Sequence, residues 1–449
     1  MQRKEIAGLG IGKLITGAVV VALALCATIF YLFYTGRFGG GSKLKITAPA
    51  RLGYEWSHLA ADNNIVSDYL FSRSKKLIVA KGGDGVLAAS SYTIAGRLVT
   101  QEAEDSGVYG LSDQALLLKC YVRAGDRANA VTLKENVISR YKLADGTYRT
   151  YVYSEGTTGE EIVLMSAMID WLDAMTEYYV TYGNDNDYNE ITALTAVLFD
   201  SEGNLRTESV SVAKYAESLY VGLDDTSSIG EDDEGSLEQI YGTITGDTES
   251  ADIENSETEE NVEGVLLSNI NLRLIRDLEN NGLIPAGAYD RALKAVKDGF
   301  ASSDHPFYAY ATSGAMDCGD YIYSGRNIGS VDIAHNVRTM MHLAEVGELD
   351  GMAFAEFKEM VMNSGRIYSE FVFMTGNYSG AEAVGAYTDG MMLAYYRGDT
   401  DLYNKLSDTL GKRVATKSTS PALYMIFREE NDRYVFYAGE NFATRLATS

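Results

Sequence analysis

The hydrophobic positions of the chain recur mostly at helical spacing after residue 51, with apolar residues three and four positions apart. Residues at this spacing share one face of a helix, so the pattern predicts amphipathic helices. Short segments that contain glycine, such as AGDR, ENNG and RGDT, separate them and are typical of helix ends. Helices that follow one another in pairs indicate an all-α domain built as a toroid. The predicted helices span residues 57–72, 91–103, 112–124, 128–141, 160–182, 189–199, 264–280, 286–300, 331–346, 351–363, 380–397, 399–411 and 438–447.

Short tyrosine-rich pieces lie between the predicted helix pairs and read as extended chain. They are TYRTYVYS, FYAYAT, DYIYSG, RIYSEFVFM and DRYVFYAG. Alternation of this kind, with many aromatic and β-branched residues, predicts short hairpins, which we expect at one end of the toroid. No repeat of fixed length is visible, which favours a closed helical barrel over an open solenoid.

The N-terminal part of the chain contains the apolar stretch LITGAVVVALALCATIFYLFY, residues 14–34, which is 21 residues without a charge. At a rise of about 1.5 Å per residue, it is long enough to cross the roughly 30 Å core of a bilayer. A cleaved signal peptide would have a shorter core and a small-x-small cleavage site, whereas this core runs directly into TGRFGGGSK. The sequence therefore predicts an uncleaved transmembrane signal anchor.

This anchor sets the expected organisation of the whole chain. Residues 1–13 form a cytoplasmic N-terminus, residues 35–50 form a flexible glycine-rich tether, and residues 51–449 form the toroidal domain. Basic residues flank both sides of the anchor, and a single N-terminal anchor usually places the large domain outside the cell. We expect a single-pass protein of the cell membrane with an extracellular domain.

The composition narrows the classes of partner. A formal net charge of −25 argues against nucleic acid, because a polyanion would be repelled. Much of this charge comes from residues 224–263, which contain many acidic residues and no Lys or Arg, and which predict a solvated insertion in the domain. The three cysteines have no Cys/His ligand spacing, so neither a metal site nor a cofactor is expected. The 32 tyrosines offer rings that pack while their hydroxyls meet water or sugar.

The first of three candidate catalytic carboxylates is Asp113, which follows Ser112 at the start of a predicted helix. Ser112 is a plausible N-cap, and an acidic residue in a first turn is favoured by the helix dipole, so a purely structural role is an open alternative. The dipole lowers the pKa of a carboxyl, whereas a general acid needs a raised pKa. Only burial or a neighbouring carboxylate can reverse this effect.

The other two candidates are Asp170 and Asp332. Asp170 lies inside the apolar helix LMSAMIDWLDAM beside Trp171, whose indole offers a surface for a sugar ring. The alternative for Asp170 is a buried, hydrogen-bonded aspartate. Asp332 lies near a helix start after the glycine-rich segment GRNIGS, where the alternative is a helix cap. His335 and His342 follow on the same helix, but their spacing of seven is a weak signal for zinc.

The order of four segments resembles glycoside hydrolase family 8. They are LSDQALLLKCYVRAGDR, SAMIDWLDAMTEYYVTYGN, NIGSVDIAHNVRTMMHLAEVGE and the stretch from GRIYSEFVFM to LYNKL. The resemblance is closest to divergent, membrane-attached members that are encoded with exopolysaccharide synthesis proteins. It implies an (α/α)6 barrel and hydrolysis of β-linked glycans with inversion.

The resemblance also implies roles for the three carboxylates. The general acid of the family is a Glu in a Ser-Glu pair at a helix start, which falls on Asp113 and is here one methylene shorter. Asp170 matches an Asp that contacts the sugar, and Asp332 matches the base. The family pattern has Arg three residues after the base, where this chain has His335.

We therefore expect an extracellular, membrane-anchored glycoside hydrolase that cleaves or trims a secreted exopolysaccharide. Its partners would be the polysaccharide, the membrane and an exopolysaccharide synthase complex, and its cleft would be lined by Trp171, Tyr109 and Tyr378. One alternative is a glycan-binding scaffold without activity, which the shortened acid motivates. A further alternative is a toroidal polysaccharide lyase that uses Tyr and His.

Overall fold

The computed structural model describes most of the chain between residues 43 and 448. The predicted anchor at 14–34 lies outside the described residues. Residues 214–258, which contain most of the predicted acidic insertion, also lie outside them. None of the described helices is long and apolar enough to cross a membrane. The described residues are 43–47, 49–53, 55–56, 67–75, 79, 84–95, 104–105, 107–155, 159–213, 259–325, 329–412, 426–430 and 433–448.

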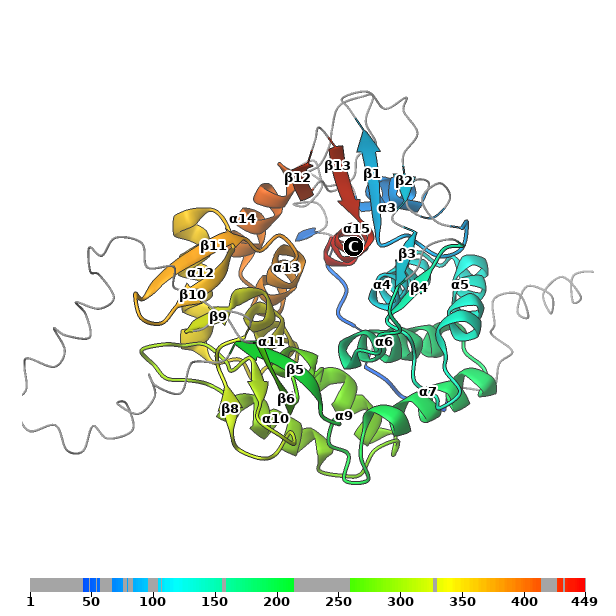
Figure 1. Ribbon diagram of the computed structural model, residues 1–449, viewed down its shortest axis with the longest axis horizontal. Helices are drawn as coiled ribbons and strands as arrows, with labels where there is room; N and C mark the ends of the chain where they lie inside the picture. Colours follow the sequence, from blue (N-terminus) through cyan, green and yellow to red (C-terminus); the bar gives the residue numbers. More distant parts are fainter. Residues whose placement is uncertain are drawn as a thin grey trace, which may run out of the picture.

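The helices alternate between an inner and an outer ring along the chain (Figure 1). Side chains of every second helix line one central cavity, which identifies these helices as the inner ring. The inner helices are α4 (Leu111–Arg123), α6 (Met165–Tyr182), α9 (Leu272–Asn280), α11 (Ile333–Glu345), α13 (Ala386–Tyr396) and α15 (Ala438–Ala447), with the short 3₁₀ helix η3 (Leu267–Asn269) before α9. The outer helices are α3 (Ser67–Ser74), α5 (Arg127–Tyr141), α7 (Asp185–Leu198), α10 (Ala288–Asp298), α12 (Gly351–Ser364) and α14 (Thr400–Gly411).

The ring is closed because the last inner helix returns to the first. Helix α15 packs against α4 and against the outer helix α3. One hydrophobic core then runs from Leu44 to Ala447. The mainly helical, closed barrel predicted from the sequence is thereby confirmed.

Side-chain caps set several of the helix starts. Asn184 and Asp187 form a capping box at α7, and Asp126, Asp350 and Asp399 accept backbone hydrogen bonds at the starts of α5, α12 and α14. Such caps satisfy amide groups that have no partner inside the helix. The acidic residues in these linkers therefore serve the fold.

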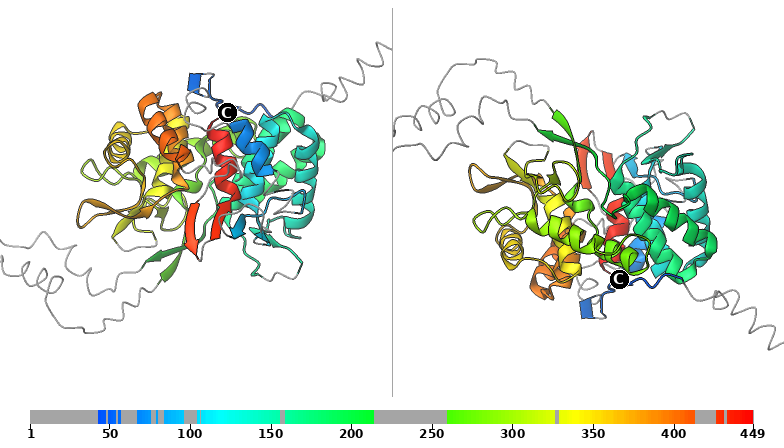
Figure 2. Two further views of the ribbon diagram at one scale, coloured as in Figure 1. Left: turned by 90° about the horizontal axis from the view of Figure 1, so that it is seen from above. Right: turned by 90° about the horizontal axis from the view of Figure 1, so that it is seen from below.

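The strands form short antiparallel sheets on one face of the helical ring (Figure 2). As predicted, the tyrosine-rich pieces contribute to them. The pairs are β3 (Val108–Gly110) with β4 (Tyr151–Tyr153), β5 (Glu208–Ala213) with β6 (Glu259–Gly264), and β7 (Ala311–Thr312) with β8 (Tyr321–Ile322). The larger sheets have the orders β11-β10-β9 and β12-β13-β1-β2, from β9 (Ser330–Asp332), β10 (Tyr368–Val372), β11 (Asn377–Glu382), β1 (Ser91–Ala95), β2 (Glu104–Asp105), β12 (Ile426–Glu430) and β13 (Arg433–Tyr437).

The helix predicted at 91–103 is wrong where the structure describes it, because Ser91–Ala95 is strand β1. This strand pairs with β13 in antiparallel register, with Ser91 opposite Tyr437. The partner strand lies near the other end of the chain, so local spacing carries no information about the pairing. The helix predicted at 380–397 also begins later, at Ala386, because strand β11 occupies its first residues.

The described part of the tether predicted at 35–50 packs against the helical barrel. Leu44 is buried, and the Lys45 amide donates to Oδ1 of Asn281 at 2.7 Å. Thr47 donates to Asp277 through both its amide and its hydroxyl. Because these groups belong to α9 and its C-terminal end, residues 43–47 seal the end of the barrel that lies opposite the hairpins, and the folded domain extends at least to Lys43.

A buried ionic cluster joins the inner helices near this sealed end. Arg273 of α9 contacts Asp173 of α6 at 2.5 Å and Glu345 of α11 at 3.0 Å. Asp173 also contacts Lys119 of α4 at 2.6 Å, and Tyr396 of α13 donates to Glu345. The neighbouring cations hold the pKa of Asp173 well below its usual range although burial opposes them. The cluster compensates charges that would be costly in the core if they stood alone.

Replacing Arg273 by Met should lower the free energy of unfolding by about 3–5 kcal/mol, because Asp173 and Glu345 are then left buried without their common cation. Arg149→Met is the matched control, since Arg149 pairs with the exposed Glu161 and should cost less than about 1 kcal/mol. Urea unfolding of both variants measures the difference. Equal losses would show that the cluster does not contribute more than a surface ion pair.

Candidate active site

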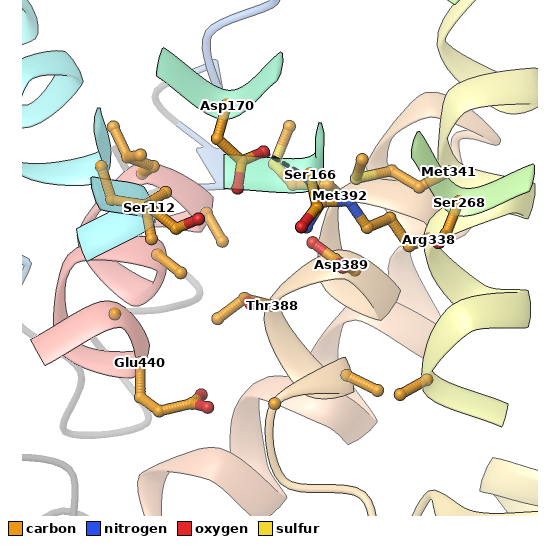
Figure 3. A pocket seen from close by; sticks show the side chains of 18 of the residues that line it. Ser112, Ser166, Asp170, Ser268, Arg338, Met341, Thr388, Asp389, Met392 and Glu440 are labelled. Atoms are coloured by element: carbon orange, nitrogen blue, oxygen red, sulfur yellow. Dashed lines mark hydrogen bonds and ion pairs between the residues drawn. The ribbon is translucent and has the colours of Figure 1, made fainter. Parts of the chain in front are cut away.

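The central cavity has a volume of about 1050 Å³ and is lined by residues from the first to the last turns of the inner helices. A strand directly precedes α4, α11 and α15, and β11 ends a few residues before α13, so the N-terminal ends of these helices meet at the hairpin face. Side chains of the first two helical turns therefore converge from different helices (Figure 3). Those that carry a titratable group are Asp113, Asp170, Arg273, His335, Arg338, Asp389 and Glu440.

Asp113 is the third residue of α4, but it does not take part in a serine cap. The N-cap of α4 is Gly110, and Ser112 is the second residue of the helix. The predicted Ser112 cap is therefore wrong. The Gly110 amide donates instead to the Ser90 hydroxyl, which donates to the Asp113 carboxylate at 2.5 Å. The Gly439 amide is a second donor to Asp113.

Burial decides the protonation of Asp113. It raises the pKa of this carboxyl to about 6, against the hydrogen bonds from Ser90 and Gly439, which lower it. The nearby charge of Asp170 raises the pKa further. The helix dipole lowers the pKa of a first-turn carboxyl, but desolvation of Asp113 raises it by more. The net pKa is therefore raised, as a general acid requires.

Two glycines make room for the Asp113 carboxylate. A Cβ atom on Gly110 would lie 2.7 Å from Oδ2 of Asp113, and one on Gly439 would lie 2.8 Å from Oδ1. Both distances are shorter than real Cβ atoms show, so either side chain would displace the carboxylate. The backbone of two different helix starts therefore fixes the position of this group.

Asp170 and Asp389 flank a shared cation in the cavity. Arg338 of α11 forms an ion pair with Asp170 of α6. Burial raises the pKa of Asp389 on α13, the charge of Arg338 opposes this rise, and the charge of Asp170 adds to it. Figure 3 shows both carboxylates near the Arg338 guanidinium.

Glu440 is a fourth cavity carboxyl, which sequence reasoning missed. It is the third residue of α15, as Asp113 is of α4, and it points into the cavity (Figure 3). Burial raises its pKa to about 7, with further contributions from Asp389 and Asp113. A signal was present in the acidic residue of the first turn of the predicted helix at 438–447, but nothing local shows that this helix closes the ring.

Asp332 is not among the described residues that line the cavity. It is the N-cap of α11, and its side chain accepts a hydrogen bond from the His335 amide at 3.1 Å. The structure thus brings Asp113 and Asp170 together but places Asp332 outside the group, in the capping role that was its alternative. His335, one turn later, does line the cavity, and its Nδ1 lies 2.7 Å from the Ser268 hydroxyl.

The three aromatic residues predicted to line the cleft lie elsewhere. Trp171 is fully buried in the core beside Tyr148, and Tyr109 is 3% exposed. Tyr378 lies on β11, where its hydroxyl donates to Glu356. A rotation of about 100° per residue turns Trp171 away from the face that carries Asp170. The tyrosines on the cavity are Tyr151, Tyr396 and Tyr437.

The residues that line the cavity are predicted better by the helical face they share than by their proximity in sequence. On α6 the residues at the cavity are Ser166, Asp170 and Asp173, spaced by four and three positions. A polar stripe at this spacing inside an apolar helix marks the side that faces a polar cavity. Within the described part of the chain, no group of three or more His, Cys, Asp or Glu residues is arranged to hold a metal ion.

Comparison with known proteins finds similar folds among solved structures of glycoside hydrolases. No family model and no curated protein matches the sequence. A novel alpha-amylase from Clostridium perfringens matches the structure with a TM-score of 0.59 and 14% identity, over 85% of this chain and 96% of that chain. A beta-1,3-1,4-glucanase from Paenibacillus sp.X4 matches with a TM-score of 0.51 and 10% identity, over 90% and 95%. PssZ from Listeria monocytogenes matches with a TM-score of 0.50 and 12% identity, over 90% and 96%.

These similarities define the class of fold. The chain has a glycosidase-like helical barrel, and its likeness to glycoside hydrolase family 8, indicated by the order of its segments, is confirmed at the level of the fold.

Replacing Asp113 by Asn should stabilise the protein at pH 8. The folded pKa of about 6 lies above the value of about 3.9 for an unfolded Asp, so the favourable contribution of the protonated carboxyl is complete below about pH 4 and is lost as the pH rises through about 6. The variant stays neutral and should gain about 3 kcal/mol at pH 8, with no gain at pH 4. Urea unfolding at both pH values tests this, and a gain that does not depend on pH would contradict it.

Proposed function

We propose that the protein is a glycoside hydrolase that cleaves a polysaccharide with inversion, with Asp113 as the general acid. The observation that carries the proposal is the position of the Asp113 carboxyl, which is buried, held by Ser90 and lines the large cavity of a glycosidase-like barrel, where burial raises its pKa. A general acid must be protonated near the working pH, and burial provides this state.

The reaction needs a second carboxylate that activates water on the opposite side of the sugar. We assign this role to Asp389 in place of Asp332, because Asp389 lines the cavity on a different helix from Asp113 and Asp332 does not. Arg338 offsets the charge of Asp389 when it is ionised. Asp170, paired with Arg338, keeps its proposed role of orienting the sugar in the cleaved subsite.

In this mechanism Asp113 donates its proton to the glycosidic oxygen as the bond to the anomeric carbon breaks. Asp389 takes a proton from the water that attacks that carbon from the other face, so the product has the inverted configuration. Tyr151 and Tyr437, which line the cavity, offer rings on which the sugars pack.

The cellular setting remains part of the proposal. Residues 14–34 would anchor the protein in the cell membrane with the barrel outside, where it would trim a secreted exopolysaccharide beside the synthase that makes it. The acidic residues of 224–263 do not favour a polyanionic glycan as substrate.

Asp113→Asn should lower the rate of glycan hydrolysis by at least about 100-fold, since it removes the proton donor. Soluble starch, mixed-linkage β-glucan and xylan are the probes, with release of reducing ends as the readout and proton NMR of the first product to identify its anomer. Asp389→Asn should lose activity similarly but recover part of it with azide, which replaces the activated water.

Asp332→Asn is the matched control, because it removes a charge outside the cavity, leaves a side-chain oxygen that can still cap α11, and should keep most of the activity. Retention of full activity in Asp113→Asn would overturn the proposal. Glycan binding without release of reducing ends by the unmodified protein would support the scaffold alternative instead.

A further inference from the structure

The cavity continues well below the carboxyls at its mouth. Along α4 its wall includes Asp113 and Arg123, and along α11 it includes Ala334 and Glu345. At a rise of about 1.5 Å per residue, the separation of Asp113 and Arg123 along the helix corresponds to a depth of about 15 Å. The volume of about 1050 Å³ is at the upper end of the range for ligand pockets. A cavity of this size holds a ligand of more than one sugar unit.

The lower chamber is the part of this cavity that lies among the second halves of the inner helices. Its wall includes Lys119, Arg123, Arg273, His342, Glu345 and Tyr396. The side chains of Lys119 and Glu345 keep 15% and 11% of their surface exposed although both belong to the buried ionic cluster. Because both residues line the cavity, this exposed surface shows that the lower chamber is hollow.

The lower chamber is closed at its base by the first described residues of the chain. Residues 43–47 hydrogen-bond to α9 and its C-terminal end, and Pro49, which follows them, lines the cavity. Leu446 and Ala447, at the end of α15, line it as well. A polymer cannot pass through a closed base, so a glycan enters the lower chamber by a chain end.

His342 lies in the wall of the lower chamber without a hydrogen-bond partner. Its residue is 4% exposed, and neither Nδ1 nor Nε2 of its ring has a partner among the described residues. Nε of Arg338, one turn earlier on α11, is also buried without a partner. Such groups cost stability, which a ligand that satisfies them would explain.

The His342 ring is uncharged in this setting. Burial and the nearby charge of Arg338 lower the pKa of His342 to about 3. A neutral imidazole has one N–H donor and one acceptor nitrogen. A sugar hydroxyl donates and accepts in the same way, so it can satisfy either nitrogen.

The cations of the lower chamber already have acidic partners. The pairs are Lys119 with Asp173, Arg273 with Glu345, and Arg123 with Glu177. An anionic ligand would have to displace one of these partners, whereas a neutral ligand leaves the pairs intact. The wall therefore fits a neutral ligand that is rich in hydroxyl groups.

We propose that the lower chamber binds the terminal sugar of a neutral glycan, with His342 hydrogen-bonded to its hydroxyls, so that cleavage falls close to a chain end. The cleavage step rests on the proposed hydrolase function, whereas the binding does not. Asp113 and Asp389 lie nearer the mouth, so the sugars held below them set the length of the released product. His342 is a specificity-determining residue that does not touch the reacting atoms.

Nitrogen-15 NMR of the full chain, labelled at histidine, tests the binding. At least one of glucose, xylose, cellobiose and maltose should shift the ring resonances of His342, which the spectrum of His342→Phe identifies. Glucuronate should bind at least about tenfold more weakly than glucose, because its carboxylate would be buried without a counter-charge. No response to any of the four neutral sugars, or tighter binding of glucuronate, overturns the inference.

His342→Phe keeps a ring of similar shape and removes both hydrogen-bonding nitrogens. It should bind the responding sugar about tenfold more weakly and unfold at a higher urea concentration, because two unpartnered polar atoms leave the interior. His342→Asn, which offers a donor and an acceptor, should recover part of the affinity. Equal affinity in His342→Phe and the unmodified protein overturns the inference.

His305→Phe is the matched control for this variant. Nδ1 of His305 is also buried without a partner, but His305 is not among the described residues that line the cavity. This variant should therefore leave sugar binding unchanged. A loss of binding equal to that in His342→Phe would contradict the assignment of the site.

The products of hydrolysis test the position of cleavage. With soluble starch, mixed-linkage β-glucan or xylan, viscosity should fall slowly relative to the release of reducing ends, and one short product should dominate from the start. His342→Phe should raise KM about tenfold with little change in kcat, whereas a structural role would lower kcat as well. A rapid early fall in viscosity overturns binding by a chain end and leaves the hydrolase function in place. Sugar binding by a protein that hydrolyses none of the probes supports the lower chamber and counts against the hydrolase function.

Discussion

The return of the last inner helix to the first is the constraint on which the rest of the structure depends. The Ala438 amide donates to the Ser90 carbonyl, and the hydroxyl of the same Ser90 holds the Asp113 carboxylate. One residue thus joins the beginning of α15 to the beginning of α4 and orients the candidate acid. Because the Gly439 amide also binds Asp113, the acid reaches its position only when the barrel is closed.

Charge is distributed unequally along the axis of this barrel. Near the sealed end, Lys119, Asp173, Arg273 and Glu345 neutralise one another. Near the mouth, Asp113, Asp170, Asp389 and Glu440 line the cavity, with Arg338 as the cation beside two of them. A buried carboxyl without a neighbouring cation has a raised pKa and takes up a proton. This arrangement costs stability, but it gives the group the protonated state that acid catalysis requires.

The local sequence pattern predicted most of the helices and identified Asp113 and Asp170. Both predictions depend only on the spacing of apolar and polar residues within one helix. It failed wherever the deciding partner is distant along the chain. Asp332 has the same local setting as Asp113, a carboxylate at a helix start, and only the packing of the ring separates a cap from a cavity residue. Glu440 was missed for the same reason, and Trp171 was misplaced because proximity in sequence was taken for proximity on a helical face.

The segment from Lys43 to Thr47 also determines how the opening of the barrel is oriented relative to the N-terminal end of the domain. It lies against Tyr179, Asp277 and Asn281, at the C-terminal ends of α6 and α9, while the carboxyls lie at the N-terminal ends of the inner helices. The chain therefore enters the domain at the base, opposite the opening. Attached to a surface through its N-terminus, the protein would hold its mouth outward, toward polymer that has already left that surface.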